Sequence, residues 1–268
     1  MFTMGPALLF CPADRPERYA KAAERADAVI LDLEDAVAPQ SREQARREVI
    51  GQQLDPERTI VRVNPPGTPD HAMDLAALRH TSYTTIMVAK SENADALAAL
   101  QGYDVVALCE TALGVLAAPQ IALAPNVCAL MWGAEDLVAS LGGTSSRFAS
   151  GTYRDVARHA RSQVLLAAGA HGKAAIDSVY VDIADLAGLA AEAEDAVASG
   201  FAAKAIIHPG QAGVIRDAYR PSADDVAEAR ELLELARREP GAFSFRGKMV
   251  DGPLIKHAEQ LLRRAEVT

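Results

Sequence analysis

The chain has 268 residues, of which 50% are hydrophobic and 24% are charged. These proportions are typical of a globular protein with a substantial core, and they exclude a disordered, collagen-like or low-complexity chain. The formal net charge of -9 argues against a nucleic-acid-binding surface, because contacts with phosphates need clustered Lys and Arg side chains.

Neither a membrane segment nor a disulfide framework is expected. The sequence has no run of about 18 apolar residues, and residues 1–10 lack the basic region that marks a signal peptide. The three cysteines, Cys11, Cys109 and Cys128, are odd in number and widely spaced. We therefore expect free thiols and a cytoplasmic protein that binds neither membrane nor nucleic acid.

Short β-branched apolar runs alternate with longer stretches of helical period along residues 1–220. Continuous apolar strands separated by helices indicate a parallel sheet that is buried on both faces. Strands are expected at Ala7–Pro12, Ala28–Leu33, Thr59–Val63, Thr85–Ala89, Val105–Cys109, Val127–Trp132, Ser178–Ile183 and Ala203–Ile207. Helices are expected between them, among others at Pro16–Ala26, Ser41–Gly51, Asp70–Leu78, Ala94–Leu100 and Tyr153–Gly169.

The number of these units favours a barrel. Eight strand–helix units in about 210 residues match a TIM barrel, for which about 250 residues is typical. An open doubly wound sheet is the main alternative, but it usually carries a Gly-rich first turn, and the sequence contains neither GxGxxG nor GxxxxGK[ST]. We predict an α/β fold, a TIM (β/α)8 barrel over residues 1–220.

Residues 221–268 are predicted to form a C-terminal helical extension. An Asp-, Glu- and Arg-rich helix is expected at Ala223–Arg238, and a last helix at Pro253–Ala265. The segment between them, Gly241–Gly252, contains two Phe residues and is too apolar for a free linker. We expect it to pack on its own barrel or on a neighbouring subunit.

Polar side chains gather at the predicted carboxyl ends of the strands, where TIM-barrel active sites lie. Most have a structural explanation when taken singly, because an Asp can cap the following helix, Lys90 can be solvated and His208 can close a turn. Arg62 and Glu110 are harder to explain, since each adjoins an apolar run and an unpaired buried charge is costly. The set comprises Asp32, Glu34, Asp35, Arg62, Asn64, Lys90, Glu110, Glu135, Asp136 and His208.

This convergence of charges predicts a metal site. Carboxylates from three strands repel one another unless a cation lies between them. The sequence has no His/Cys cluster with zinc spacing and no HExxH, so oxygen ligands point to a hard cation such as Mg²⁺. The metal would polarise a substrate oxygen, and Arg62 would hold a substrate carboxylate through two hydrogen bonds. A Schiff base on Lys90 is the less favoured alternative.

Seven short motifs follow one another along nearly the whole chain: Leu9–Arg18, Leu31–Val37, Val61–Asn64, Cys109–Thr111, Trp132–Leu137, Ile207–Pro209 and Val250–Pro253. In this order they resemble the motifs of the citrate lyase β-subunit-like group of the HpcH/HpaI aldolase superfamily, especially those of its short stand-alone members.

The resemblance implies a homotrimeric TIM barrel that cleaves or forms a C–C bond in 3-hydroxyacyl-CoA thioesters such as malyl-CoA or citramalyl-CoA. Acetyl-CoA and a 2-oxoacid would be the products of cleavage. It implies Mg²⁺ on Glu110 and Asp136, and a substrate carboxylate on Arg62. The remaining implied roles are metal waters on Glu34 and Asp35, CoA phosphates on Arg15 and Lys21, substrate contacts by Asn64 and Glu110, and an acid or base, Asp251, that reaches a neighbouring subunit's site.

We predict a retro-Claisen cleavage in which a base removes the 3-hydroxyl proton, the C–C bond breaks and the enolate is protonated. Arg62, Asp251 and Glu34 are the predicted catalytic residues. The base stays open between Asp251, Glu34 and a metal-bound water, and Asp251 is alternatively a helix cap ahead of Pro253.

Two other functions remain open. The same site could hydrolyse a malyl-CoA-type thioester, or the chain could be a citrate lyase β-like subunit that acts on a carrier-bound acyl group. The compact segment between strands two and three favours a soluble CoA thioester. Ala89 stands where relatives commonly have proline, a departure of minor weight.

Overall fold

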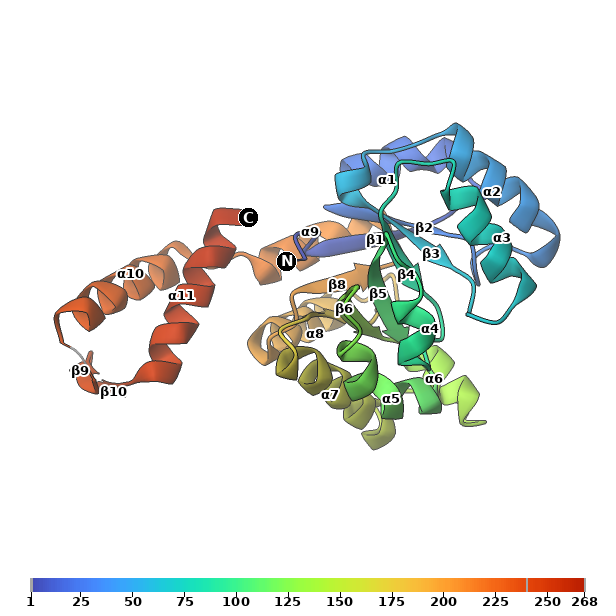
Figure 1. The fold of residues 1–268 in the computed structure, drawn as a ribbon. Helices are drawn as coiled ribbons and strands as arrows, with labels where there is room; N and C mark the ends of the chain where they lie inside the picture. Colours follow the sequence, from blue (N-terminus) through green and yellow to red (C-terminus); the bar gives the residue numbers. More distant parts are fainter. Residues whose placement is uncertain (1, 240, 268) are drawn as a thin grey trace. The chain divides into compact units, whose positions relative to one another are not determined.

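The computed structural model describes residues 2–239 and 241–267, and a closed barrel of parallel strands is its main feature (Figure 1). The strands follow one another in sequence order, and β1 pairs with β8 to close the ring. The predicted TIM barrel is confirmed. The strands are β1 (Ala7–Pro12), β2 (Ala28–Asp32), β3 (Thr59–Val63), β4 (Thr85–Val88), β5 (Asp104–Cys109), β6 (Val127–Trp132), β7 (Ala174–Asp177) and β8 (Ala203–Ile206).

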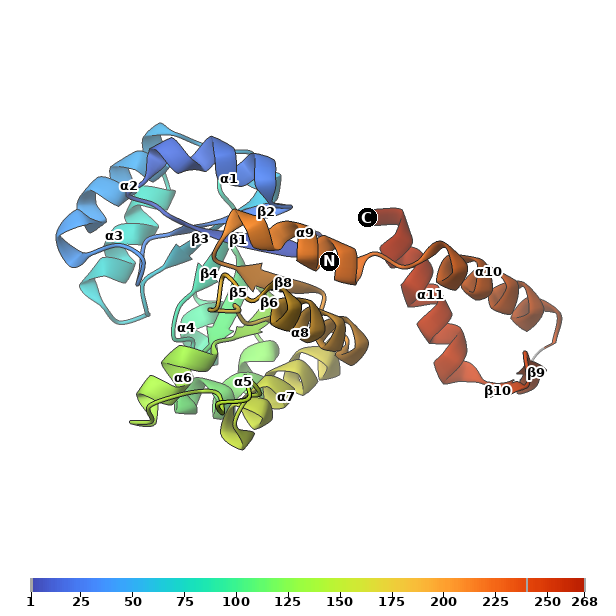
Figure 2. The same cartoon turned by 180° about the vertical axis from the view of Figure 1, so that it is seen from behind.

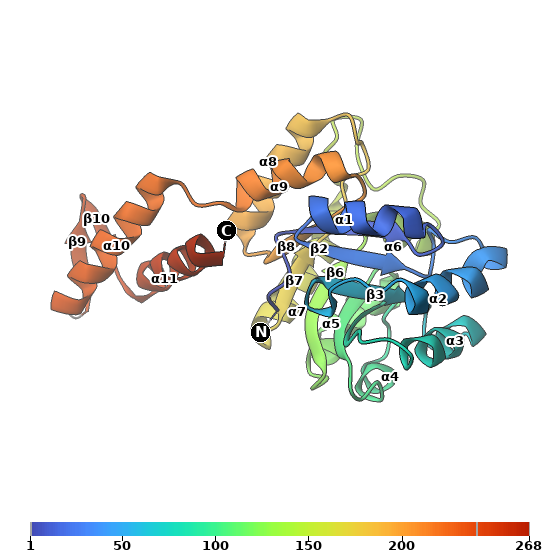
Figure 3. The same cartoon turned by 90° about the horizontal axis from the view of Figure 1, so that it is seen from above.

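The helices of the barrel lie outside its strands, as the two opposite views show (Figures 1 and 2), and α1 to α3 flank β2 and β3 in the view from above (Figure 3). Several begin where a side chain accepts a hydrogen bond from the first turn, as Thr68, Asn93, Thr111 and Asp185 do. They are α1 (Tyr19–Arg25), α2 (Arg42–Gly51), α3 (Pro69–Leu78), α4 (Ala94–Ala98), α5 (Ala112–Ala122), α6 (Ala134–Ser140), α7 (Asp155–Ala170), α8 (Leu186–Ser199) and α9 (Ala212–Tyr219), with short 3-10 turns at Pro16–Arg18, Pro39–Ser41, Pro56–Arg58 and Pro209–Gln211.

The prediction for the seventh strand is wrong. The strand is Ala174–Asp177, whereas Ser178–Ile183 lies in the connection to α8. The β-branched pattern of that connection is typical of a strand, yet Val181 and Ile183 are exposed. The true strand is only four residues long and is Ala-rich, so β-propensity does not reveal it; its pairing with β6 and β8 defines it.

Side-chain alternation along the strands fills the barrel. Interior residues recur at every second position, as in Ala28 and Ile30 or Leu108 with Val106, because successive side chains of a strand point to opposite faces. The interior cluster comprises Leu8, Ala28, Ile30, Ile60, Met87, Val106, Leu108, Ala129, Met131, Ile176, Ala203 and Ala205. The residues between these positions face the surrounding helices.

One such outward residue, Lys204, is fully buried between β8 and its covering helices. Its ammonium lies 2.9 Å from Asp177 Oδ2 and 2.8 Å from Glu192 Oε1, and it donates to the Ser178 carbonyl at 2.7 Å. Arg161 pairs with the same Asp177 at 2.9 Å. Although burial acts to raise the pKa of Asp177, the charges of Lys204 and Arg161 hold it below its usual range.

Residues 216–239 and 241–267 form a second compact unit. Its elements are α10 (Ala223–Arg238), β9 (Phe243–Phe245), β10 (Lys248–Val250) and α11 (Gly252–Val267). The segment expected to be a loop is a β-hairpin, and its two Phe side chains are buried in a cluster with Leu232 of α10 and Ala258 of α11. The apolar residues of this segment therefore have partners within their own unit.

Two of the composition-based expectations can be compared with the structure. In residues 2–239 and 241–267, no helix combines the length and the apolar character needed to cross a membrane. All three cysteines are free thiols, as expected.

We predict that Lys204→Met lowers the free energy of unfolding by about 3 kcal/mol, because it leaves buried carboxylates without their ammonium partner. Arg161 still pairs with Asp177, which keeps the loss at the lower end of the usual range. The measurement is urea denaturation followed by the fluorescence of Trp132, the only tryptophan of the chain. Lys248→Met, at an exposed position, is the matched control, and a Lys204→Met variant as stable as this control would contradict the prediction.

Candidate active site

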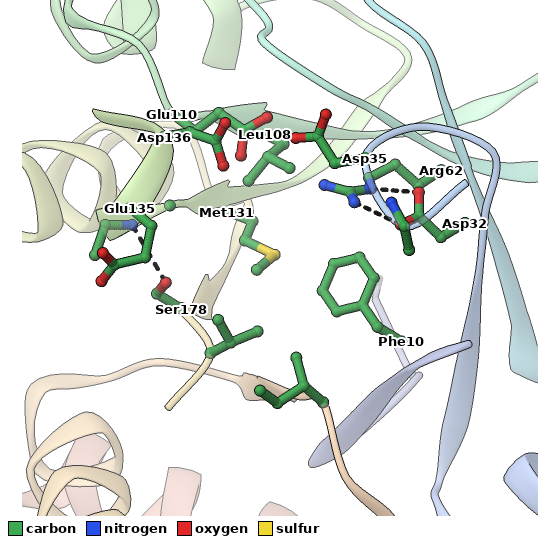
Figure 4. A pocket seen from close by; sticks show the side chains of 15 residues that line it. Phe10, Asp32, Asp35, Arg62, Leu108, Glu110, Met131, Glu135, Asp136 and Ser178 are labelled. Atoms are coloured by element: carbon green, nitrogen blue, oxygen red, sulfur yellow. Dashed lines mark hydrogen bonds and ion pairs between the residues drawn. The ribbon is translucent and has the colours of Figure 1, made fainter. Parts of the chain in front are cut away.

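A pocket of about 230 Å³ lies at the carboxyl end of the barrel, on top of the apolar interior (Figure 4). Seven of its residues stand two positions after an interior residue, so they continue the inward-facing rows by one layer. In this layer, Ile30 is followed by Asp32, Ile60 by Arg62 and Leu108 by Glu110. The other four are Phe10, Gly133, Ser178 and Ile207. Strand alternation therefore places charged groups directly above a closed hydrophobic core.

Arg62 is held by two carboxylates of β2 and the loop after it. Its Nε and Nη2 donate to the two oxygens of Asp32 at 2.7 and 2.6 Å, and its Nη1 lies 3.0 Å from Glu34 Oε2. Burial acts to lower the pKa of Arg62, but the two carboxylates raise it, so the guanidinium stays charged. The expected anionic partner of Arg62 thus exists within the chain.

Asp32 organises the turn as well as the arginine. Its two oxygens also accept the backbone N–H groups of Glu34 at 2.9 Å and Ala36 at 3.1 Å. The sequence placed Asp32 among the strand-end charges but assigned it no role. The position of Asp32 could have revealed its role, because Asp32 follows Ile30 in the same inward-facing row and is directly opposite Arg62 in the strand register.

Lys90 lies among four carboxylates and is not a solvated surface residue. Its ammonium is hydrogen-bonded to Glu34 and lies 3.2 Å from Asp35, 3.5 Å from Asp136 and 3.9 Å from Glu110. Burial acts to lower the pKa of Lys90, but the hydrogen bond to Glu34 and the surrounding charges raise it. A permanently protonated amine is a poor nucleophile, which argues against the Schiff base.

Glu110 is the most constrained of these acids. Burial, reinforced by the charge of Asp136, raises the pKa of Glu110 to about 8. Its Oε1 accepts the backbone N–H of Lys90 at 3.1 Å. A Cβ at position 133 would lie 2.8 Å from Glu110 Cβ and 2.9 Å from its Oε2, so only glycine leaves room for this carboxylate.

Glu110 and Asp136 are the acids that suit a metal. A buried carboxylate whose pKa is raised is a poorly stabilised anion, and a cation beside it would relieve that cost. Within residues 2–239 and 241–267, no three His, Cys, Asp or Glu side chains are grouped so that they could hold a metal together. Two carboxylates suffice for Mg²⁺, which keeps water and substrate oxygens as its other ligands.

Asn64 is in a structural position. Its Nδ2 donates to Asp74 Oδ2 at 2.8 Å and to the Leu33 carbonyl at 2.9 Å, and the residue is buried behind the pocket wall. The structure therefore does not bring Asn64 into the set that lines the pocket. His208 caps a short 3-10 turn by accepting the Gly210 N–H on its Nδ1, as the turn interpretation predicts.

Arg15 and Lys21 are exposed and lie outside the pocket lining. Arg15 follows β1 in the loop at the mouth of the barrel, and Lys21 lies on α1. Asp251 belongs to the second unit, between β10 and α11, and its carbonyl accepts the Ile255 N–H at 3.1 Å at the start of α11. Glu135, which sequence reasoning left without a role, lines the pocket and accepts a hydrogen bond from Ser146 Oγ at 2.6 Å.

Comparison with known proteins identifies the family of the chain. The profile of the HpcH/HpaI aldolase/citrate lyase family matches residues 7–103 and 99–209. A citrate lyase subunit beta-like protein of Mycobacterium tuberculosis is 56% identical over 261 residues, which cover 97% of this chain and 96% of the relative. Human mitochondrial citramalyl-CoA lyase is 29% identical over 295 residues, covering 97% of this chain and 85% of that protein.

A solved structure extends the likeness to three dimensions. The crystal structure of CitE from M. tuberculosis in complex with magnesium, acetoacetate and coenzyme A superposes with a TM-score of 0.93 at 56% identity, and 98% of each chain is covered. The family profile and this near-complete match agree on one assignment. The chain belongs to the HpcH/HpaI aldolase/citrate lyase family.

Proposed function

We propose that the protein is a Mg²⁺-dependent carbon–carbon lyase that cleaves or forms 3-hydroxyacyl-CoA thioesters such as malyl-CoA or citramalyl-CoA. Acetyl-CoA and a 2-oxoacid are the products of cleavage. The observation that carries the proposal is the pocket in which the buried Arg62 faces the buried Glu110 and the half-buried Asp136. The relatives named citramalyl-CoA lyase and CitE with magnesium and coenzyme A support the same chemistry.

Glu110 and Asp136 are the proposed metal-holding pair, with Glu34 and Asp35 beside them. Mg²⁺ on this pair would supply Lewis-acid polarisation of a substrate oxygen. Gly133 lets Glu110 approach, and the first turn of α6 carries Asp136. The chain's own part in the chemistry is thus to hold two carboxylates rigidly at the edge of a closed apolar core.

Arg62 is the proposed anchor of the oxoacid half of the substrate. The guanidinium uses its Nε–Nη2 edge for Asp32, which leaves hydrogens on Nη1 and Nη2 for a second, two-pronged partner. Because Asp32 and Glu34 fix the guanidinium, little conformational entropy is lost when a substrate carboxylate binds. The fixed charge also favours the oxyanion character that develops as the C–C bond breaks.

Asp251 is our preferred base for the 3-hydroxyl proton. Glu34, the other side-chain candidate, has Oε1 bound to Lys90, while its Oε2 lies 3.0 Å from Arg62 and accepts the Asp35 N–H at 3.2 Å. Burial raises the pKa of Glu34 against the charges of Arg62 and Lys90, but these contacts occupy both of its carboxylate oxygens and leave it poorly placed to take a proton. We propose that Asp251 of a neighbouring copy supplies the base, and that the copies form a homotrimer.

Three further assignments complete the proposal. Arg15 and Lys21 are cations near the mouth of the barrel, suited to the phosphates of CoA. Exposed leucines on α5, Leu113 and Leu116, support self-association, since apolar side chains in one place on a surface favour an interface. A cytoplasmic location is supported by the three free thiols.

Replacing Arg62 tests the anchor. We expect Arg62→Ala to lower kcat/KM for malyl-CoA or citramalyl-CoA cleavage by about 10³-fold or more, because both the anchor and a charge beside the reacting carbons are lost. Arg62→Lys keeps the charge without the two-pronged geometry and should lose most of the same activity. A thermal melt of each variant monitors folding, and near-wild-type turnover in either one would refute the role.

The pKa of Glu110 predicts a pH dependence of Mg²⁺ binding. Below pH 8 the carboxyl is largely protonated, so Mg²⁺ has to displace a proton to bind. The association constant should therefore rise by about tenfold per pH unit below pH 8 and level off above it. Isothermal titration calorimetry in buffers of different ionisation enthalpy measures both the affinity and the proton released. An affinity that is constant from pH 6 to 8 would contradict this prediction.

Mixing variants tests whether Asp251 acts across subunits. We expect Asp251→Asn and Arg62→Ala to be nearly inactive alone, and to recover up to roughly a quarter of the activity when co-assembled, because some sites combine one intact barrel with one intact Asp251. Arg62→Ala mixed with Glu110→Gln is the control, since every barrel then carries a defect. No recovery in the first mixture would place Asp251 in its own subunit's site or outside catalysis.

A further inference from the structure

Lys90 is a cation that the proposed reaction leaves without a role. Its ammonium makes its closest contacts with Glu34 and Asp35, the latter at 3.2 Å. It also lies 3.5 Å from Asp136 and 3.9 Å from Glu110, the pair assigned to the metal. Within the described part of the chain, Lys90 and Arg62 are the cations paired with these acids, and Arg62 is engaged by Asp32.

The backbone holds Lys90 in this position at some cost. Its φ of 48° lies in the left-handed region that residues other than glycine seldom adopt. This conformation directs the Lys90 N–H to Glu110 Oε1 at 3.1 Å, while the side chain reaches the other three carboxylates. A strained residue that contacts the site with both its backbone and its side chain indicates a function of the site rather than of the loop.

We propose that Lys90 is a resident counter-ion and a positioning residue for the metal. It neutralises the carboxylates before Mg²⁺ arrives, and Mg²⁺ binding shifts its ammonium away from Glu110 and Asp136 to Glu34 and Asp35. The inference rests on the proposed function, because it takes Glu110 and Asp136 as the metal-holding pair. The Lys90 ammonium then holds Glu34 in place beside Arg62, whose Nη1 lies 3.0 Å from Glu34 Oε2.

The two cations compete for the same oxygens, and this fixes the direction of the effect. Lys90 stabilises the metal-free site, because its charge offsets that of the acidic side chains gathered around it. The same charge repels the incoming Mg²⁺. A residue that served only to support the carboxylates would have the opposite effect, because its removal would loosen the ligands and weaken metal binding.

The test is the affinity for Mg²⁺ itself, measured by isothermal titration calorimetry on the full chain without substrate. We expect Lys90→Met to bind Mg²⁺ roughly tenfold more tightly than the wild type, since a unit positive charge near both ligand carboxylates is removed. Lys173→Met, just before β7 at the other end of the barrel, is the matched control and should bind like the wild type. Without metal, Lys90→Met should melt at a lower temperature, and Mg²⁺ should raise its melting temperature more than that of the wild type.

Lys90→Gly separates the ammonium from the backbone. Glycine tolerates the positive φ and keeps the N–H that binds Glu110, so this variant should also bind Mg²⁺ more tightly. Unchanged or weaker Mg²⁺ binding in both variants, with a wild type that binds the metal, would overturn the role of Lys90 and leave the proposed function standing. A wild type that fails to bind Mg²⁺ would overturn both.

Discussion

A strand in a closed barrel turns every second side chain inward, and in this protein the apolar interior is followed on the same rows by a layer to which three strands contribute charged side chains. The rows place Asp32, Arg62 and Glu110 above Ile30, Ile60 and Leu108. Because the closed apolar interior lies directly beneath these groups, each charged side chain has to be paired with a polar group of the same layer or of the loops beside it. The paired carboxylates and cations of the pocket, and the strict need for glycine at position 133, follow from this one geometric constraint.

The charged side chains of the pocket are unequally paired. Asp32 satisfies Arg62 with a two-pronged bond, which makes that pair a fixed unit. Glu110 has no comparable partner, and its pKa is raised to about 8 by burial and by Asp136. A cation that binds beside Glu110 would stabilise its charged form, whether that cation is the ammonium of Lys90 or a divalent metal. A substrate anion is drawn to Arg62, on the other side of the same pocket.

The barrel could be predicted from the sequence because its strands are mostly continuous β-branched runs, such as Ala28–Asp32 and Thr59–Val63. β7 could not, because three of its four residues, two alanines and Asp177, carry little β-propensity and the stronger pattern lies in the loop that follows. Arg62, Glu110 and Asp136 were identifiable as charges next to apolar runs. Asp32 was among the strand-end charges but received no role, because its role depends on strand register. Asn64 was expected to contact the substrate, whereas its amide is hydrogen-bonded to Asp74.

Lys90 shows a further limit of sequence reasoning. A lysine after a strand is as typical of a solvated loop as of a site, and only the positive φ and the four surrounding carboxylates distinguish the two. The proposed role of Asp251 requires an assembly of copies, which the pattern of a single chain does not encode. The proposed roles are therefore best supported for those residues that the eight strands of a single barrel bring together.

The most direct test of the central claim is a Mg²⁺-dependent assay with malyl-CoA and citramalyl-CoA that quantifies acetyl-CoA, free CoA and 2-oxoacid in the same sample. The account predicts equal amounts of acetyl-CoA and 2-oxoacid from at least one substrate, and loss of both products on addition of EDTA. Free CoA with the hydroxy acid left intact would instead make the protein a thioesterase and contradict the lyase. Absence of turnover on both substrates, with Mg²⁺ bound, would also contradict it and would favour a carrier-bound acyl substrate.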